Sequence, residues 1–483
     1  MQFHHSPAER VFYYFHEICQ IPHGSGNTKA VSDYCVQFAK EHGLEYYQDS
    51  LNNVIIIREA AKGYEDHKPY IIQGHLDMVC EKDADRTIDF EKEGLDLYEE
   101  QGYLKARGTT LGADDGIAIA YGLALLEKED LKSPRLEVVF TVDEETGMYG
   151  AKGIDLSVLK GRELLNLDSE EEGIFLCGCA GGMRARAEFS FTREIRSGIL
   201  AVLTLTGLHG GHSGSEIQKE YGNAIQLMGR VLKELEQLCH YSLIHINGGL
   251  KDNAIPREAS AEILLSEDNM DSFHSAVSHM ESILHKEYEN TDPELKLSAS
   301  VKKAETSEHV MAKQGKHQIL TFLYTMPNGV QHMSTDLYDL VETSLNAGIM
   351  TTSENHVQIS FSIRSSVSSR KRLLADQIRL LTESLLGCYT EDGEYPAWEY
   401  RKDSLLRKRL IQVYEELFNQ RPKVEAIHAG LECGLFLEKL PDLDCVSLGP
   451  QIDDIHTPSE KLSIASTEKI WKFLLEFLKK GNL

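Results

Sequence analysis

The sequence of 483 residues lacks the features of a membrane protein. No apolar run approaches the ~20 residues that a helix needs to cross a bilayer. The N-terminal segment, MQFHHSPAER, has no apolar core of a secretory signal peptide. We therefore expect no membrane partner and a cytoplasmic protein.

Positive charge is also scarce. The sequence has 50 Lys and Arg residues against 76 Asp and Glu residues, which gives a formal net charge of −26. A protein that binds nucleic acid or an anionic membrane surface needs a positive face. The charge balance therefore argues against both kinds of partner.

Paired cysteine motifs are missing as well. The nine cysteines are an odd number, are scattered from Cys19 to Cys445 and form no CxxC pair. A disulfide scaffold or a structural zinc finger would need such pairs. The cysteine usage instead fits a reducing cytoplasm, and the sequence contains no internal repeat or low-complexity segment.

The pattern that is present is that of an α/β protein. Apolar runs at 54–57, 70–72, 138–140 and 164–165 predict strands that are buried on both faces. An Ala- and Leu-rich segment at 117–128 predicts a helix between two of them. This alternation predicts a sheet with helices on both sides.

The middle of the chain has a different pattern, in which strands with alternating polarity, such as 358–363, are separated by long amphipathic helices. This predicts an inserted α+β domain over 184–394. Residues 1–183 and 395–483 are expected to form one α/β domain around it. The two linkers would then lie side by side and act as a hinge.

Four short motifs place acidic residues or histidines at or soon after the end of a predicted strand, or at a helix start. They are GHLD at 74–77, GADDG at 112–116, DEETG at 143–147 and NLD at 166–168. Ligands of open α/β sheets bind beyond the carboxyl ends of the strands, so we expect these groups to converge. Like charges a few Å apart raise each other's pKa, and divalent cations relieve that repulsion. Two cations that share a bridging carboxylate would use this set of acids best.

Each motif has a plainer explanation when it is taken alone. His75 and Asp77 fit a local hydrogen bond, and Asp114 with Asp115 fits helix capping. The acids at 143–145 fit a solvated turn, and a late histidine fits an exposed loop. The joint occurrence of the motifs in one order favours the metal interpretation.

This order of motifs resembles the di-zinc amidohydrolase family that includes acylases, carboxypeptidases and carnosinases. Within it, GHLDMVCEK (74–82), TTLGADDGIAIA (109–120), GGHSG (210–214), HAGLECG (428–434) and GPQIDDIHTPSE (449–460) resemble the bacterial aminoacyl-histidine dipeptidases. The resemblance extends over essentially the whole chain. It implies a mixed-sheet catalytic domain, an inserted lid domain and two zinc ions, although manganese or cobalt would suit the same ligand types.

The resemblance implies a role for each residue of the metal site. Asp114 would bridge the two ions, His75 and Asp168 would complete one site, and Glu145 and His456 would complete the other. The commoner family pattern after the bridging acid is Asp-x-Lys-Gly-Gly, whereas this sequence has Asp-Asp-Gly without the lysine. The difference narrows the subgroup and leaves the metal role intact.

The resemblance also implies the catalytic groups beside the metals. Glu144 would be the general base, and Asp77 would accept the spare ring N–H of His75 and so fix its tautomer. The peptide bond between Asp114 and Asp115 would be cis.

Further residues are expected in the lid domain and the late loop. His212 in GGHSG resembles the histidine that stabilises the tetrahedral oxyanion, and His209 is the rival in the same loop. Arg364 and Asn253 resemble the groups that hold the C-terminal carboxylate of the substrate.

Two residues of the HAGLECG motif, His428 and Glu432, have two open roles. They would receive the amino group or a histidine side chain of the substrate, or they would brace the catalytic loops.

The sequence thus predicts a metal-dependent dipeptidase, of Xaa-His type, that acts on small peptides. The alternatives are an enzyme of the same fold that hydrolyses acyl-amino acids or tripeptides, and a metal-binding homologue without turnover. The retained Glu144 argues against the last. The insertion is long enough for a dimerisation surface or a duplicated lid, so a homodimer and action of His212 in cis or in trans stay open.

Overall fold

The computed structural model describes residues 6–482, except for the side chain of Lys303. The first five residues of the N-terminal segment considered above lie outside the described residues. The chain divides into two compact units. Unit 1 comprises Met1–Gly178, Tyr400–Ala426 and Glu432–Leu483, and unit 2 comprises Cys179–Glu399 and Ile427–Leu431.

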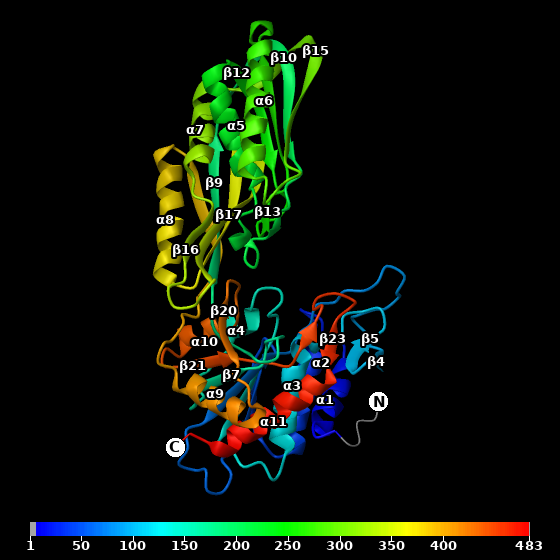
Figure 1. Cartoon of the computed structure of the whole chain (residues 1–483). Coiled ribbons are helices and arrows are strands. Elements are labelled where there is room, and N and C mark those ends of the chain that lie inside the picture. The colour runs from blue at the N-terminus through cyan, green and yellow to red at the C-terminus, as the bar shows by residue number, and fades with distance from the viewer. Residues whose placement is uncertain (1–5, 483) are drawn as a thin grey trace. The chain divides into compact units, whose positions relative to one another are not determined.

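Unit 1 is built on an eight-stranded mixed sheet (Figure 1). In spatial order the strands are β1 (Glu45–Gln48), β2 (Val54–Arg58), β6 (Leu136–Thr141), β3 (Tyr70–His75), β7 (Glu163–Asn166), β21 (Asp444–Ser447), β8 (Ile174–Cys179) and β20 (Lys423–Ile427). The four central strands β6, β3, β7 and β21 are parallel to one another. Their carboxyl ends therefore meet at one edge of the sheet.

Helices cover this sheet and bury both of its faces. They are α1 (Glu9–Cys19), α2 (Lys29–Glu41), α3 (Ala113–Glu127), α4 (Tyr149–Gly153), α9 (Leu405–Phe418), α10 (Cys433–Lys439) and α11 (Ile464–Lys480). In β2, Val54 and Ile56 belong to the main core, and Ile55 and Ile57 are buried on the opposite face. The predicted pattern of strands buried on both faces is confirmed, and so is the mixed α/β class.

A small four-stranded sheet lies in the same unit. Its order is β22 (Ile452–Asp453), β23 (Lys461–Ser463), β5 (Tyr103–Ala106) and β4 (Leu97–Glu100). It pairs the segment before α3 with the segment before α11, which are far apart in the sequence.

Unit 2 contains a nine-stranded antiparallel sheet. Its order is β15 (Lys296–Met311), β10 (Arg193–Thr206), β14 (Ala259–Leu265), β12 (Tyr241–Gly248), β17 (Val341–Thr352), β18 (His356–Ser365), β9 (Gly181–Ser190) and β19 (Cys388–Tyr395), with β16 (Gly329–Met333) also paired to β17. Helices α5 (Ala224–Leu238), α6 (Met270–Glu287), α7 (Lys313–Thr325) and α8 (Ser368–Ser384) share one core with the sheet. Alternate residues of β18 are buried, which explains the alternating polarity of its sequence. The strands β11 (Gly211–His212) and β13 (Ala254–Ile255) form a separate two-stranded antiparallel sheet.

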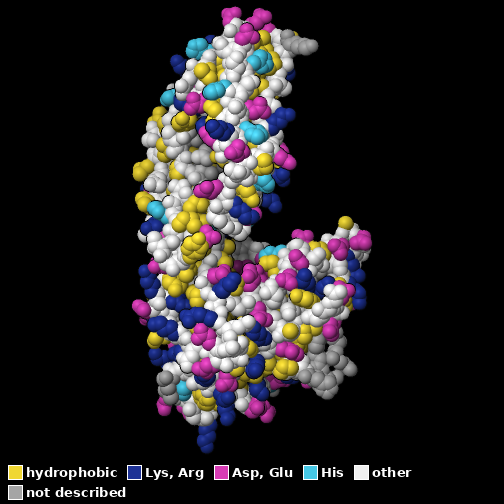
Figure 2. Space-filling view, viewed as in Figure 1, with side chains coloured by type: hydrophobic (Ala, Val, Ile, Leu, Met, Phe, Trp, Pro, Cys, Tyr) yellow, Lys and Arg dark blue, Asp and Glu magenta, His cyan; other side chains and the backbone are white. Residues whose placement is uncertain are grey.

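Three further features concern the charged surface, the length of the helices and the cysteines. Acidic and basic side chains are intermixed over the face shown in Figure 2. Within residues 6–482, no helix combines the length and the apolar character needed to cross a bilayer. All nine cysteines lie in this range, and none of them forms a disulfide.

Candidate metal centre and active site

The strand ends and one helix start of unit 1 bring the predicted metal ligands together. His75 is the last residue of β3, Asp168 follows β7, Glu145 follows β6 and His456 follows β22. Asp114 lies in the first turn of α3, where its backbone is not yet helical. The parallel arrangement of β6, β3 and β7 explains the convergence, because these strands end at the same edge.

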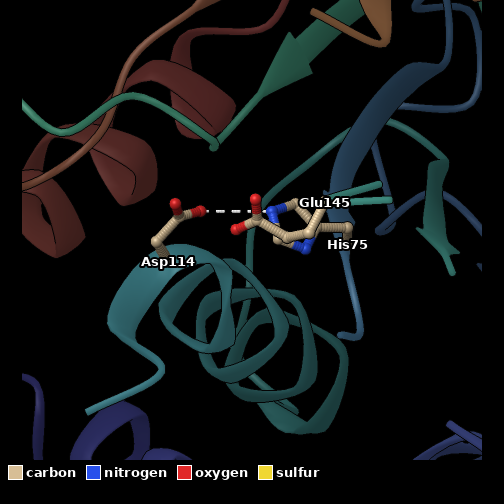
Figure 3. A group of neighbouring side chains, drawn as sticks. All are labelled: His75, Asp114 and Glu145. Atoms are coloured by element: carbon tan, nitrogen blue, oxygen red, sulfur yellow. Dashed lines mark hydrogen bonds and ion pairs between the residues drawn. The ribbon is translucent and has the colours of Figure 1, made fainter. Parts of the chain in front are cut away.

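Asp114 lies between the two histidines. Its Oδ1 is 3.1 Å from Nε2 of His75, and its Oδ2 is 3.1 Å from Nε2 of His456. Figure 3 shows Asp114, His75 and Glu145 pointing toward one another from three different segments of the chain. Two oxygens of one carboxylate that face two different nitrogens form the geometry of a bridging ligand.

The other two predicted ligands complete the cluster. Oε1 of Glu145 lies 2.8 Å from Nε2 of His456, and Oδ1 of Asp168 lies 3.7 Å from Nε2 of His75. Ligand atoms of His75, Asp114 and Glu145 all lie within 4.8 Å of one another. The same holds for His75, Asp115 and Asp168, so Asp115 belongs to the cluster although we gave it no role from the sequence.

Burial and neighbouring charges shift the pKa values of the residues in this cluster. Burial raises the pKa of Asp168 well above its usual value, and the neighbouring carboxylates of Asp115 and Asp114 add to the shift. Burial lowers the pKa of His75, but its hydrogen bonds to surrounding carboxylates outweigh this and raise it. Hydrogen bonds to Asp114 and Glu145 raise the pKa of His456 to about 10.

This donor set fits divalent cations. Two imidazoles and three carboxylates face one space, and Zn²⁺, Mn²⁺ and Co²⁺ take ligands of these types. The predicted ligands Asp114, Glu145 and Asp168 bring three negative charges that are too close to remain ionised together without compensation. Two divalent ions would neutralise them.

Asp77 differs in detail from the prediction. Nδ1 of His75 hydrogen-bonds to the main-chain carbonyl of Asp77 at 2.9 Å, and the Asp77 carboxylate is 3.5 Å from the same nitrogen. The main-chain oxygen is thus the nearer acceptor. The carboxylate instead accepts the backbone N–H groups of Glu144 at 3.1 Å and Glu145 at 3.4 Å, and the hydroxyl of Ser25 at 2.8 Å. It therefore holds the loop that carries both glutamates.

Glu144 lies beside the cluster. Burial raises the pKa of its carboxyl to about 8, and the acidic neighbours Glu432 and Glu145 act in the same direction while His75 opposes them. The peptide bond between Asp114 and Asp115 is cis, as predicted.

Glu432 is fully buried in unit 1. Its Oε2 accepts hydrogen bonds from the Gln73 amide and the Thr141 hydroxyl, both at 2.6 Å. Gln73 lies in β3 and Thr141 ends β6, so Glu432 ties together the ends of two strands that carry the site.

In unit 2, the two-stranded sheet β11–β13 places His212 opposite Ala254. Nδ1 of His212 accepts the backbone N–H groups of Gly214 at 3.3 Å and Ser215 at 3.2 Å. Burial and the positive charge of Arg364 lower the pKa of this histidine. These contacts leave the proton of the neutral ring on Nε2.

The loop around His212 is anchored by the buried carboxylate of Asp292. It accepts the backbone N–H groups of His209 at 2.7 Å and Gly222 at 2.8 Å, which lie on either side of His212. The ring of His209 stacks on Tyr221 and is about half exposed. These contacts favour His212 over His209 as the oxyanion donor.

The remaining predicted residues of unit 2 surround the same loop. Arg364 donates from Nη1 to the Tyr395 hydroxyl at 3.1 Å, and its buried Nε has no hydrogen-bond partner among the described residues. The main-chain carbonyl of Asn253 accepts the N–H of Ser213 at 2.9 Å.

His428 is buried in the same unit, 2.7 Å from the Ser344 hydroxyl. Burial lowers the pKa of this histidine to about 3, and the positive charge of Arg364 and the ring of His212 add to the shift.

Glu460 is a further residue of the site that was not among those predicted from the sequence. Its carboxylate accepts four consecutive backbone N–H groups, those of residues 111–114, at the start of α3. Burial and the charge of Asp114 raise its pKa to about 7, whereas the N–H donors lower it. Its place in the motif with His456 was the only signal in the sequence.

Comparisons with known proteins identify the family. The chain matches "Peptidase family M20/M25/M40" over residues 71–480. It is 39% identical over 468 residues to the cytosol non-specific dipeptidase of Escherichia coli (strain K12), with 96% of each chain covered.

Solved structures give the same result. The aminoacylhistidine dipeptidase from Vibrio alginolyticus matches with a TM-score of 0.94 at 36% identity, covering 100% of this chain and 99% of that one. A tripeptidase from Staphylococcus aureus matches with a TM-score of 0.56 at 15% identity, covering 98% of each chain, and shares the fold.

Proposed function

Because the chain belongs to peptidase family M20/M25/M40 and is a metallopeptidase that hydrolyses peptide bonds, we propose that it cleaves dipeptides, including those of Xaa-His type. The observation that carries the proposal is the placement of Asp114 between His75 and His456, with one carboxylate oxygen toward each. The names of the two similar dipeptidases support the substrate class.

The metal residues have defined parts in this proposal. Asp114 would contact both ions, with His75 and Asp168 on one side and Glu145 and His456 on the other. When bound, two zinc ions would supply Lewis acidity, lowering the pKa of the attacking water and polarising the scissile carbonyl.

Glu144 acts as the general base. Its carboxylate takes the proton of the attacking water and returns it to the leaving amine. Asp77 supports this step through its hydrogen bonds to the backbone of Glu144 and Glu145, which hold the loop in place.

His212 donates from Nε2–H to the oxyanion of the tetrahedral intermediate. The two backbone donors at Nδ1 fix the required tautomer, and the lowered pKa keeps the ring neutral. A fixed donor of this kind costs no reorganisation when negative charge develops.

Arg364 and Asn253 bind the C-terminal carboxylate of the dipeptide. The unpartnered Nε of Arg364 offers a donor, and a guanidinium fork matches a carboxylate. The contacts of Glu432 and His428 support the bracing role for both rather than direct contact with substrate. Glu432 is enclosed by Gln73 and Thr141, and His428 is held by Ser344.

The compartment and the assembly are also part of the proposal. The cysteine usage and the cytosolic relative support a cytoplasmic location. The two alternatives are a homodimer and a monomer with a duplicated lid, and light scattering of the purified protein separates them.

A dipeptide panel tests the function. Purified protein should hydrolyse Xaa-His dipeptides more rapidly than N-acyl-amino acids and tripeptides. A chelator should abolish the activity, and zinc, manganese or cobalt should restore it. Preference for an N-acyl-amino acid or a tripeptide would show an enzyme of the same fold with another substrate, and no turnover on any substrate would contradict the proposal.

A further inference from the structure

A single buried carboxylate, that of Glu460, holds the loop that leads into α3. Its Oε2 accepts the N–H groups of Leu111 at 2.8 Å and Gly112 at 3.1 Å. Its Oε1 accepts the N–H of Ala113 at 2.8 Å and the more distant N–H of Asp114 at 3.4 Å. Glu460 is 3% exposed, so water cannot replace these contacts.

The local chemistry requires an acceptor at this position. The first N–H groups of a helix have no partner within the helix, and leaving them buried without an acceptor is costly. An ionised carboxylate offers about four acceptor sites, which matches the four donors. Gly112 has φ of +68°, and the Cβ atom of any other residue there would lie 2.8 Å from the Met78 sulfur. The glycine thus lets the chain turn around the carboxylate.

Glu460 also fixes this loop relative to His456. His456 directly precedes the turn formed by residues 457–460, which is closed by the hydrogen bond from the N–H of Glu460 to the carbonyl of Thr457 at 3.1 Å. Strand β23 begins at the next residue, Lys461, and pairs with β5, so the turn is attached to the rest of unit 1 on its other side. Asp114 therefore contacts the segment 456–460 at both ends, through its backbone at Glu460 and through its carboxylate at His456.

We propose that Glu460 is a positioning residue that sets the proposed bridging ligand Asp114 against His456, and thereby determines the affinity of the centre for divalent cations. The inference rests on the proposed function only in taking Asp114 and His456 as metal ligands. Glu460 acts through the backbone of 111–114, and it contacts neither the substrate nor the cations in this role.

The test compares two buried glutamates. Glu460→Gln replaces one oxygen by an NH₂ group that faces backbone donors instead of accepting from them. Glu137→Gln is the matched control, because Glu137 is fully buried and accepts the N–H groups of Lys160 at 3.0 Å and Gly161 at 2.9 Å. Glu137 lies near the start of β6, at the end opposite to the proposed ligands.

Metal-free wild type and both variants are titrated with zinc by calorimetry and with cobalt by visible absorption. Glu460→Gln should weaken the binding of at least one ion by about 10- to 100-fold, as the loss of groups that orient metal ligands does. Glu137→Gln should bind both ions as the wild type does, even where it lowers the temperature of unfolding.

Unchanged affinity in a folded Glu460→Gln protein would overturn the inference, and so would equal weakening in both variants. If Glu460→Gln does not fold, Glu460→Asp is titrated in the same way. Its side chain keeps the charge but is one methylene shorter. Weaker binding of the ions would support the inference, and wild-type binding would overturn it. Failure of the wild type to take up two ions would instead contradict the proposed metal centre, which keeps the two failures distinct.

Discussion

The Nδ1 atom of His212 accepts the backbone N–H of Gly214 at 3.3 Å, so the neutral ring carries its proton on Nε2. This contact turns a histidine in a glycine-rich loop into a hydrogen-bond donor of fixed direction. The lowered pKa of the ring keeps it neutral near pH 7. Both features suit a donor to an oxyanion.

Replacement of His212 by alanine should therefore lower kcat by about 10²- to 10³-fold, as the loss of an oxyanion donor does. The metal content should stay unchanged, because the residue is not among the proposed ligands. Steady-state kinetics on a good Xaa-His dipeptide and metal analysis of the same preparation check this. His209→Ala is the matched control from the same loop and should keep wild-type kcat. The opposite result would assign the role to His209.

Replacement of Glu144 by glutamine should lower kcat by at least about 10²-fold, because the amide cannot accept the proton of water. The cations should remain, since Glu144 is proposed to touch the water and not the ions. Turnover rates and metal content of the variant are the measurements. A variant that keeps most of its kcat would require another base.

The metal centre should hold two ions per chain. Metal analysis after zinc loading should give two equivalents for the wild type and at most one for His456→Ala, because that variant lacks a ligand of one site. Dialysis against a chelator should remove the ions together with the activity. Less than one equivalent in the wild type would contradict the proposed centre.

Arg364→Ala should mainly raise KM. Hydrogen bonds to a charged group contribute about 1.5–3 kcal/mol, which corresponds to a rise of about 10- to 100-fold. A dipeptide with an amidated C-terminus provides the control, because it has no carboxylate to lose. Wild type and variant should have similar KM values for the amidated substrate. An equal effect on both substrates would show that Arg364 does not bind the carboxylate.

His428 should make the stability of the protein depend on pH. Its pKa is lowered to about 3 in the folded chain, where burial, Arg364 and His212 disfavour the charged ring. The unfolded chain, with an ordinary histidine pKa of about 6.5, binds more protons between these values, so the stability that this group contributes falls as the pH falls from 6.5 toward 3.

The comparison is between wild type and His428→Asn, in denaturant titrations at pH 7 and pH 5.5. Over this interval the wild type should lose about 1 kcal/mol more of its free energy of unfolding than the variant does. The double difference removes the contribution of all other titrating groups. Equal losses in the two proteins would show that His428 does not remain neutral when the chain is folded.

The fold class and the types of side chain in the site could be predicted from the sequence. The strands at 54–57 and 70–72 could be predicted because a strand that is buried on both faces needs a continuous apolar run. The observed strands β2 and β3 contain these residues. Local spacing predicted that the motifs at 74–77, 112–116, 143–147 and 166–168 converge, because they lie near strand ends or at a helix start. The resemblance to the di-zinc family supplied the ligand set that includes His456. The structure places His75, Asp114, Glu145, Asp168 and His456 together.

The hydrogen bonds that hold the site residues in place became visible in the tertiary structure alone. Glu460 reaches a loop 346 residues away, and Glu432 reaches Gln73 across 359 residues. The nearer acceptor of His75 is a main-chain carbonyl rather than the carboxylate of Asp77, and the tautomer of His212 depends on how its loop turns. A sequence pattern records which side chains lie near a strand end. Hydrogen bonds between distant segments depend on the packing of whole elements, and no local spacing encodes them.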